Sequence, residues 1–170
     1  HPRDRRQRQM CIRDSYKEIK NKYMEKFVKN NREINNSVSV KTSISGVRTI
    51  YKALKDKKVI CFAADQVPKR GLGEHIKLYN KMAYTTTLVQ NLASKTNCPV
   101  IYLCMNSNIN GFLSVSIKPC SDDIYDNSKH LQLVNKDIEK LINRRPIDYS
   151  WEYKRFKRSL PEEENLYSGI

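Results

Sequence analysis

Apolar residues recur every three to four positions in four stretches of the chain, which is the period of a helix with one buried face. The first stretch, residues 16–32, has apolar side chains at Ile19, Tyr23, Phe27 and Val28, with Lys and Glu between them. This pattern predicts an amphipathic helix with a basic outer face. The other predicted helices cover residues 47–56, 85–95 and 131–143, and Pro146 ends the last of them.

Four other stretches have the pattern of β-strands. Residues 59–64 and 100–105 are short apolar runs bounded by charged or turn residues, which favours buried strands. Residues 112–117, and Val38 with Val40, alternate with polar positions. Strands that alternate with helices predict an α/β domain, here a mixed sheet flanked by helices. Because a helix separates 59–64 from 100–105, we expect these two runs to be neighbouring parallel strands of one sheet.

The chain carries a strong positive charge. Its 170 residues include 32 Lys and Arg against 18 Asp and Glu, a formal net charge of +14. This excess implies an anionic partner, and charge alone leaves nucleic acid, an acidic protein and an anionic membrane open. No apolar run approaches the roughly 20 residues of a membrane-spanning helix. The 5 cysteines include no C-x-x-C pair, so we expect no disulfide framework, no zinc site and a reducing, cytoplasm-facing location.

The first 15 residues differ in composition from the rest. They contain five Arg, two Asp and no Lys, whereas Lys outnumbers Arg from Tyr16 onward, and the stretch QRQMCIRDS resembles translated sequencing-adapter read-through. An Arg-rich arm for nucleic acid is the functional alternative. We expect residues 1–15 to be a foreign, disordered segment that does not pack on the domain, residues 16–158 to form the domain, and residues 159–170 to be a tail.

Several candidate functional residues lie in the loop over residues 65–73. Asp65 follows a predicted strand, and ligands of open α/β sheets bind beyond the carboxyl ends of strands. Its carboxylate can orient a cation or a base, or it can simply cap a turn. Lys69 and Arg70, with glycines beside them, offer cations and free amides for phosphate, although a loop this polar can also be merely solvated.

The two internal histidines, His75 and His130, belong to no catalytic or metal motif. Neither is followed five positions later by Asp or Glu, because Asn80 and Asn135 stand there. We interpret both as structural or solvated, and we expect no metal and no cofactor.

Residues 151–158 combine three aromatic side chains with four cations. Such a mixture suits an anionic membrane interface, single-stranded nucleic acid, or ordinary helix packing with long cationic side chains.

Four stretches of the chain carry a family resemblance. Residues 46–66 look like a helix, a strand and an Asp-Gln loop, which falls on Asp65 and Gln66. The run LYNKMAYT at 78–85 is similar to Phe-Phe-Gly-x-x-Ala-x-Thr, with Asn80 in place of Gly. The other two are Leu92-Ala93 followed by Cys98-Pro99-Val100, and Pro146-x-x-Tyr149-x-Trp151-x-x-x-Arg155-Phe156-Lys157. In this order they resemble the lipid A biosynthesis (late) acyltransferases, members of the lysophospholipid acyltransferase superfamily.

The resemblance implies part of a glycerolipid-acyltransferase-like fold that moves a fatty acyl chain from acyl carrier protein to a hydroxyl of a phosphorylated glucosamine disaccharide, the lipid A precursor. It implies a place at the cytoplasmic face of the cell inner membrane, whose anionic surface, like both substrates, would attract a basic chain. The site residues that we expect are Arg32 and Asp65 in catalysis, and Gln66, Lys69, Arg70 and Arg155 in substrate binding.

The family's general base lies in a His-x-x-x-x-Asp/Glu motif, in which the carboxylate orients the imidazole that deprotonates the acceptor hydroxyl. That motif and the family's membrane anchor stand N-terminal to the stretches that match. The resemblance therefore implies the C-terminal part of such an enzyme, lacking its N-terminal portion and inactive by itself.

Two other functions stay open, as does a folded remnant that serves only as an interaction surface. Another lysophospholipid or glycerolipid acyltransferase would share the catalytic logic but not the Trp-x-x-x-Arg-Phe-Lys ending. A basic nucleic-acid-binding module would present base-stacking aromatic residues on a sheet face. The predicted strands lack such a platform, so we expect no nucleic-acid partner.

Overall fold

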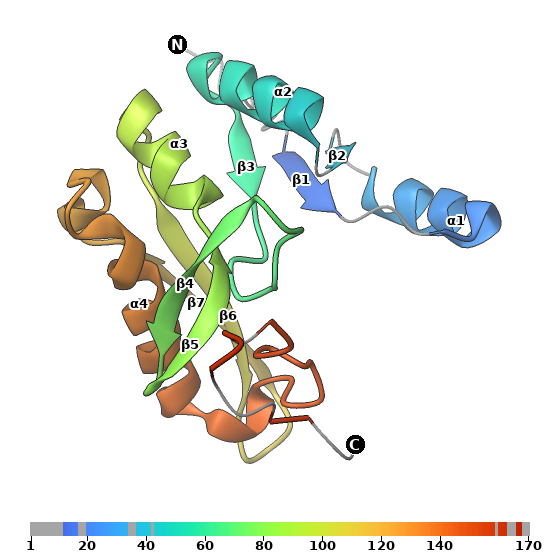
Figure 1. The fold of residues 1–170 in the computed structure, drawn as a ribbon. Helices are drawn as coiled ribbons and strands as arrows, with labels where there is room; N and C mark the ends of the chain where they lie inside the picture. Colours follow the sequence, from blue (N-terminus) through green and yellow to red (C-terminus); the bar gives the residue numbers. More distant parts are fainter. Residues whose placement is uncertain are drawn as a thin grey trace, which may run out of the picture. The chain divides into compact units, whose positions relative to one another are not determined.

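The structure is a computed structural model that describes residues 12–16, 20–33, 37–41, 43–158, 160–162 and 166–167. The chain divides after Ala63 into two units, His1–Ala63 and Ala64–Ile170. Each unit has its own sheets and helices (Figure 1). Asp65 and the last resembling stretch, residues 146–157, therefore belong to the second unit, and Arg32 belongs to the first.

The first unit contains a three-stranded parallel sheet in the order β2-β1-β3. Its elements, in chain order, are β1 (Ile12–Tyr16), α1 (Lys22–Arg32), β2 (Val38–Lys41), α2 (Ile44–Lys55) and β3 (Val59–Cys61). Side-chain oxygens fix the start of both helices, because Asn21 Oδ1 accepts from the amides of the first turn of α1 and Ser43 Oγ accepts from Gly46 N. Helix α2 buries Ile50 and Ala53 on one face.

The start of this unit differs from the sequence-based expectation. The predicted helix over residues 16–32 begins only at Lys22, since Tyr16 ends β1 and Asn21 caps the helix. Residues 12–15, which we assigned to the foreign segment, pair with β2 on one side and β3 on the other. Residues 1–11, the rest of that segment, lie outside the described residues.

The second unit contains two antiparallel strand pairs and two α-helices in its described part. These elements, in chain order, are β4 (Gly73–Leu78), β5 (Lys81–Thr86), α3 (Leu88–Thr96), β6 (Ile101–Ser107), β7 (Leu113–Pro119), the 3₁₀ turn η1 (Asp122–Tyr125), α4 (His130–Arg144) and the 3₁₀ turn η2 (Pro146–Asp148). The helices predicted over 85–95 and 131–143 correspond to α3 and α4, within three residues at each end.

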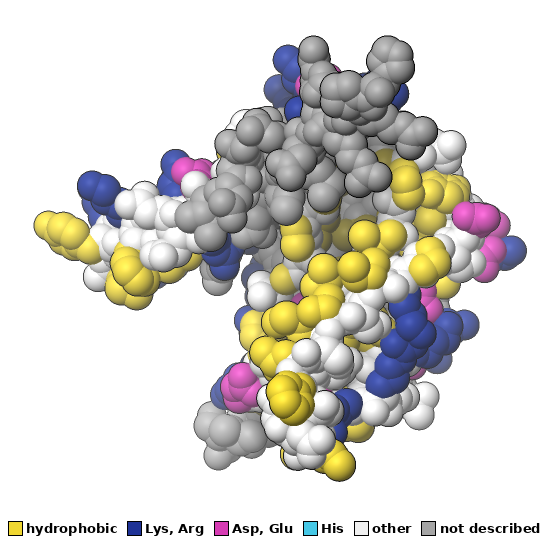
Figure 2. Space-filling model, turned by 180° about the vertical axis from the view of Figure 1, so that it is seen from behind, with side chains coloured by type: hydrophobic (Ala, Val, Ile, Leu, Met, Phe, Trp, Pro, Cys, Tyr) yellow, Lys and Arg dark blue, Asp and Glu magenta, His cyan; other side chains and the backbone are white. Residues whose placement is uncertain are grey.

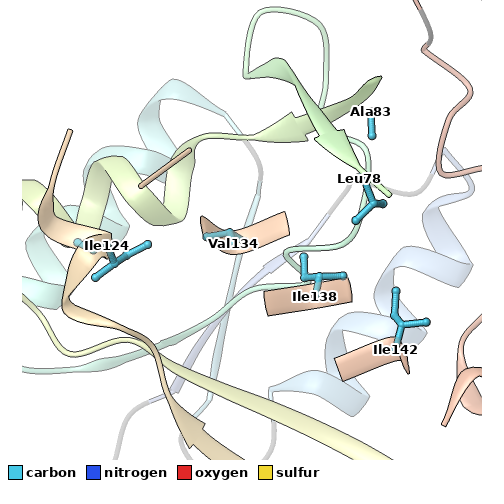
Figure 3. Packing of buried hydrophobic residues seen from close by; sticks show 7 residues of the cluster. Leu78, Ala83, Ile124, Val134, Ile138 and Ile142 are labelled. Carbon is cyan, nitrogen blue, oxygen red and sulfur yellow. The ribbon is translucent and has the colours of Figure 1, made fainter. Parts of the chain in front are cut away.

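The core of the second unit lies between α4 and the β4–β5 hairpin. Figure 3 shows Val134, Ile138 and Ile142 on successive turns of α4, with Leu78 and Ala83 of the hairpin beside them. All five side chains are at most 7% exposed. The i, i+4, i+8 spacing in α4 is the apolar stripe that the sequence pattern predicted, and each large buried side chain contributes about 1.5–3 kcal/mol.

The predicted α/β class is confirmed, and parallel and antiparallel pairing are both present, spread over three small sheets. The prediction that 59–64 and 100–105 are neighbouring strands of one sheet is wrong. Strand β3 pairs with β1 in the first unit, and β6 pairs with β7 in the second. A tight turn explains the second pairing, because Asn108 Oδ1 accepts from the amides of Asn110 and Phe112 and folds β7 back onto β6.

One face of the β6–β7 ribbon is apolar and exposed, although β6 was predicted to be buried. Its six side chains are 58 to 72% exposed: Ile101, Leu103, Met105, Leu113, Val115 and Ile117. Figure 2 shows hydrophobic side chains in a diagonal band over this ribbon. On the opposite face the Tyr102 hydroxyl lies 3.4 Å from Cys120 Sγ, and burial raises the pKa of Tyr102. The ribbon is thus half-buried rather than central.

Candidate functional site

The candidate site centres on the Asp65 loop, residues 65–73, which leads into β4. Asp65 is half-buried in a turn. Gln66, Lys69 and Arg70 are exposed on the same loop. Four of the predicted site residues therefore lie within six positions of one another, and three of them face solvent, where a phosphate or another anion can reach them.

The C-terminal segment, residues 149–158, fixes the Asp65 loop from one side. The backbone N–H of Val67 donates to Tyr153 Oη at 2.7 Å. The guanidinium of Arg158 donates to Pro68 O at 2.5 Å. These bonds join residues 86 and 90 positions apart in the chain, so the loop keeps its conformation only while this segment is folded against it.

Strand β5 fixes the loop from the other side. The backbone N–H of Gly71 donates to Tyr84 Oη at 2.9 Å. At Gly73 a Cβ atom would lie 2.4 Å from Thr85 O and 2.7 Å from Pro68 Cγ, closer than real contacts allow. Only glycine fits at this crossing of loop and strand, which brings the loop directly against β5.

Asp65 lies near two buried polar groups of the C-terminal segment, Tyr149 and Arg155. Burial raises the pKa of Tyr149 to about 12, and the negative charge of Asp65 adds to this rise. The same carboxylate favours the charged form of Arg155, whose pKa burial lowers. Tyr149 Oη and Arg155 Nε are buried without a hydrogen-bond partner among the described residues. Asp65 therefore lies near two buried donor groups, Tyr149 Oη and Arg155 Nε, that no hydrogen bond uses within the described part of the chain.

Arg155 is buried rather than presented to a substrate. The side chain is 3% exposed, and its terminal nitrogens donate to Tyr84 O at 2.9 Å and Thr85 Oγ1 at 2.7 Å. Thr85 Oγ1 also accepts from Asn135 Nδ2 of α4 at 3.1 Å. Arg155 thus joins the C-terminal segment to β5 and, through Thr85, to α4.

The remaining predicted catalytic residue, Arg32, is the last residue of α1 in the first unit and is exposed. Asp65, Gln66, Lys69 and Arg70 lie on one loop, and Arg155 is buried against β5, close enough for the charge of Asp65 to act on it. Sequence reasoning missed Tyr84 and Tyr153, whose hydroxyls hold the loop, because nothing local distinguishes them from the other tyrosines among the 10 in the chain.

Neither internal histidine faces an open site. His75 Nε2 is hydrogen-bonded to Arg158 O at 2.9 Å, and its ring lies 5.1 Å from the Tyr84 ring. His130 is 5% exposed at the start of α4. Within the part of the chain that the structure describes, no group of three His, Cys, Asp or Glu side chains is arranged to hold a metal ion.

Tyr167, in the segment 159–170 that we assigned to a tail, contacts the C-terminal segment. Tyr167 Oη accepts from the backbone N–H of Phe156 at 3.0 Å. The Lys154 ammonium lies 5.5 Å from the Tyr167 ring, a cation–π contact. This part of the tail therefore contributes to the packing of the C-terminal segment.

A family model of bacterial lipid A biosynthesis acyltransferases matches residues 6–158. The chain belongs to this family. The match spans α1, the Asp65 loop, the β4–β5 hairpin and the C-terminal segment. All four resembling stretches therefore lie within a single match to the family model. The chain is thus of an acyltransferase type, acting in lipid A synthesis. No curated protein matches the chain.

Asp148 joins the 3₁₀ turn η2 to the end of β6. Its carboxylate accepts from Ser107 N at 2.9 Å and from Ser107 Oγ at 2.7 Å, and it lies 2.9 Å from Arg145 Nε. These hydrogen bonds, that of the Ser107 hydroxyl first, lower the pKa of Asp148.

We therefore expect Asp148→Asn to lower the stability of the chain at neutral pH. A carboxyl whose pKa is lower in the folded state stabilises the fold above its unfolded-state value of about 3.9, and this contribution is lost as the pH falls through the folded-state value. The difference between Asp148→Asn and the parent should shrink steadily below pH 4 in urea unfolding. Glu162→Gln, at an exposed carboxylate, is the control; a difference that persists at low pH would contradict the linkage.

Proposed function

We propose that this chain supplies the donor-binding and acceptor-binding surface of an enzyme that moves a fatty acyl chain from acyl carrier protein to a hydroxyl of a lipid A precursor. The family membership supports the reaction class. The observation that carries the proposal further is the Asp65 loop, where a half-buried carboxylate and the exposed Lys69 and Arg70 share one rigid turn.

The roles follow from position and exposure. Lys69 and Arg70 contact the phosphates of the acceptor or the acidic surface of the carrier, and Gln66 offers an amide for hydrogen bonds beside them. Asp65 orients a reacting group, and the support for this role is that its charge acts on the buried Tyr149 and Arg155. Arg155 acts as a positioning residue. Arg32, in the first unit, is the cation that we assign to catalysis together with Asp65.

The chain by itself binds substrates but transfers no acyl group. Deprotonation of the acceptor hydroxyl needs a base, and an imidazole held by a carboxylate is the usual one. His75 is engaged by Arg158 O, His130 is buried in α4, and neither has an acidic residue five positions later. The base therefore comes from outside this sequence.

The reaction takes place at the cytoplasmic face of the inner membrane. The support is electrostatic: a chain of net charge +14 concentrates at an anionic surface, and acyl carrier protein and lipid A phosphates are anionic as well. No helix in the described ranges has the length and apolar content to cross a membrane.

Binding of acyl carrier protein by the isolated chain tests the proposal. We expect saturable binding that weakens with salt, at least tenfold weaker for the double variant Lys69→Glu, Arg70→Glu, and no acyl transfer to a lipid A precursor. The matched control is Lys95→Glu, Lys136→Glu, which reverses two exposed lysines on α3 and α4. Tighter binding of a single-stranded oligonucleotide than of acyl carrier protein at the same salt would favour the nucleic-acid module instead. Acyl transfer by the chain alone would show that the base lies within it.

A further inference from the structure

We propose that α1 is an interfacial anchor, a helix that lies on an anionic phospholipid surface with its apolar face against the lipid. This inference rests on the proposed function, because it names the element of this chain that meets the membrane. Residues 151–158, for which the sequence left a membrane interface as one of three alternatives, are a different candidate for this contact.

The first observation is an unpartnered apolar face on α1. Tyr23 is 87% exposed, Phe27 64% and Met24 51%, and no residue of this helix is buried. With Val28, these residues stand at positions i, i+1, i+4 and i+5, which form one face of a helix. Figure 2 shows hydrophobic side chains at the surface of this helix, with Lys and Arg side chains on it as well. A helix that contributes to a protein core would bury these rings, and this one exposes them.

The second observation is the charge on the rest of α1. Lys22, Lys26, Lys29 and Arg32 are cationic and Glu25 is the one acidic residue in Lys22–Arg32, so the helix carries +3, four minus one. At 100° per residue these cations occupy the arc opposite the apolar face. A short helix with large exposed apolar side chains on one face and cations on the other is complementary to an anionic lipid surface, where the rings enter the interface and the cations meet headgroups.

Comparison with the β6–β7 ribbon shows why charge points to α1 as the lipid-binding surface. Its exposed apolar face has more large aliphatic side chains than α1, yet its two strands carry a single charged residue, Lys118. Arg144 and Arg145 donate to Ser116 and Ser107 of these strands, but the ribbon's own residues carry one cation against the +3 of α1, so its electrostatic match to anionic lipid is weaker. The ribbon therefore provides the control surface for the experiment, and α1 carries the proposal.

Vesicle co-sedimentation of the full chain tests the anchor. The probes are mixed phosphatidylcholine–phosphatidylglycerol vesicles and pure phosphatidylcholine vesicles at low and high salt. We expect binding to the mixed vesicles only, at least tenfold weaker for Phe27→Ser, and about fivefold weaker for each cation removed in Lys22→Gln, Lys26→Gln. The matched control is Phe112→Ser, whose side chain is 70% exposed in the turn of the β6–β7 ribbon. Since no residue of α1 is buried, its variants should keep the parent's circular dichroism.

A fluorescent reporter separates insertion from charge attraction. The chain has a single tryptophan, Trp151, so Phe27→Trp in a Trp151→Phe background reports on α1 alone. We expect a blue shift of its emission with the mixed vesicles and none with pure phosphatidylcholine.

The anchor and the proposed function fail in different ways. Equal vesicle binding by Phe27→Ser and the parent, or a loss of binding only in Trp151→Ser or Phe112→Ser, would overturn the anchor and leave binding of acyl carrier protein intact. If Phe27→Ser lost acyl carrier protein binding instead of vesicle binding, α1 would dock that protein and not lipid. A chain that binds vesicles through α1 but not acyl carrier protein would refute the proposed function alone.

Discussion

Asp65→Ala should lower acyl transfer by one to several powers of ten in a full-length enzyme that carries this segment, with little loss of stability. Each factor of ten in rate corresponds to about 1.4 kcal/mol of transition-state stabilisation. A carboxylate that only capped a turn would cost about 1 kcal/mol of folding free energy and leave the rate unchanged. The two roles are therefore separated by measuring kcat/KM and urea unfolding on the same variant.

The environment of Asp65 adds a readout that needs no substrate. Its negative charge contributes to the raised pKa of Tyr149, about 12. Asp65→Asn removes that charge, so the pKa of Tyr149 should fall, which ultraviolet titration of tyrosine ionisation detects. Glu152→Gln, at an exposed carboxylate in the same segment, is the matched control. Normal turnover by a folded Asp65→Ala enzyme would assign Asp65 to the structural role of a turn residue.

The fold was predictable where periodicity is local. Helix α4 and strands β6 and β7 lie within two residues of their predicted ends. An apolar stripe at i, i+4 specifies α4, an alternation at i, i+2 specifies β7, and a short apolar run specifies β6. The β4–β5 hairpin was missed. Its turn contains Tyr79, with φ 46°, a left-handed conformation that an aromatic residue rarely adopts, so the usual Gly signal of a hairpin is absent. The pairing of β6 with β7 rather than with β3 depends on the turn at Asn108.

The candidate site was predictable where its residues are neighbours in sequence. Asp65, Gln66, Lys69 and Arg70 share a loop for that reason alone. The burial of Arg155 was not predictable, because the pattern of residues 154–158 offers four cations and only the folded chain shows which one is buried against β5. The partners that fix the loop lie far away in sequence, so no local rule finds them.

Arg155→Ala should be the most destabilising of these substitutions, with a loss of about 2–4 kcal/mol. The guanidinium is 3% exposed and donates to Tyr84 O and Thr85 Oγ1, and hydrogen bonds to charged groups contribute roughly 1.5–3 kcal/mol each. Asn135 Nδ2 remains as a partner for Thr85 Oγ1. Most of the lost folding free energy therefore comes from the carbonyl of Tyr84, which loses its donor. A typical domain has a total stability of about 5–15 kcal/mol, so the effect should be visible as a large fall in the urea midpoint.

Two substitutions decide whether Arg155 positions the loop or contacts substrate. Lys157→Ala removes an exposed cation that lies 4.6 Å from the Tyr153 ring, and it should cost less than about 1 kcal/mol. Arg155→Lys keeps the charge but loses the planar fork that reaches two acceptors at once, so its stability should fall between the parent and Arg155→Ala. Because the loop is fixed by Tyr84 and the C-terminal segment together, acyl transfer in a full-length enzyme should fall in parallel with stability across this series. Activity that falls in Arg155→Lys at unchanged stability would instead make Arg155 a substrate contact.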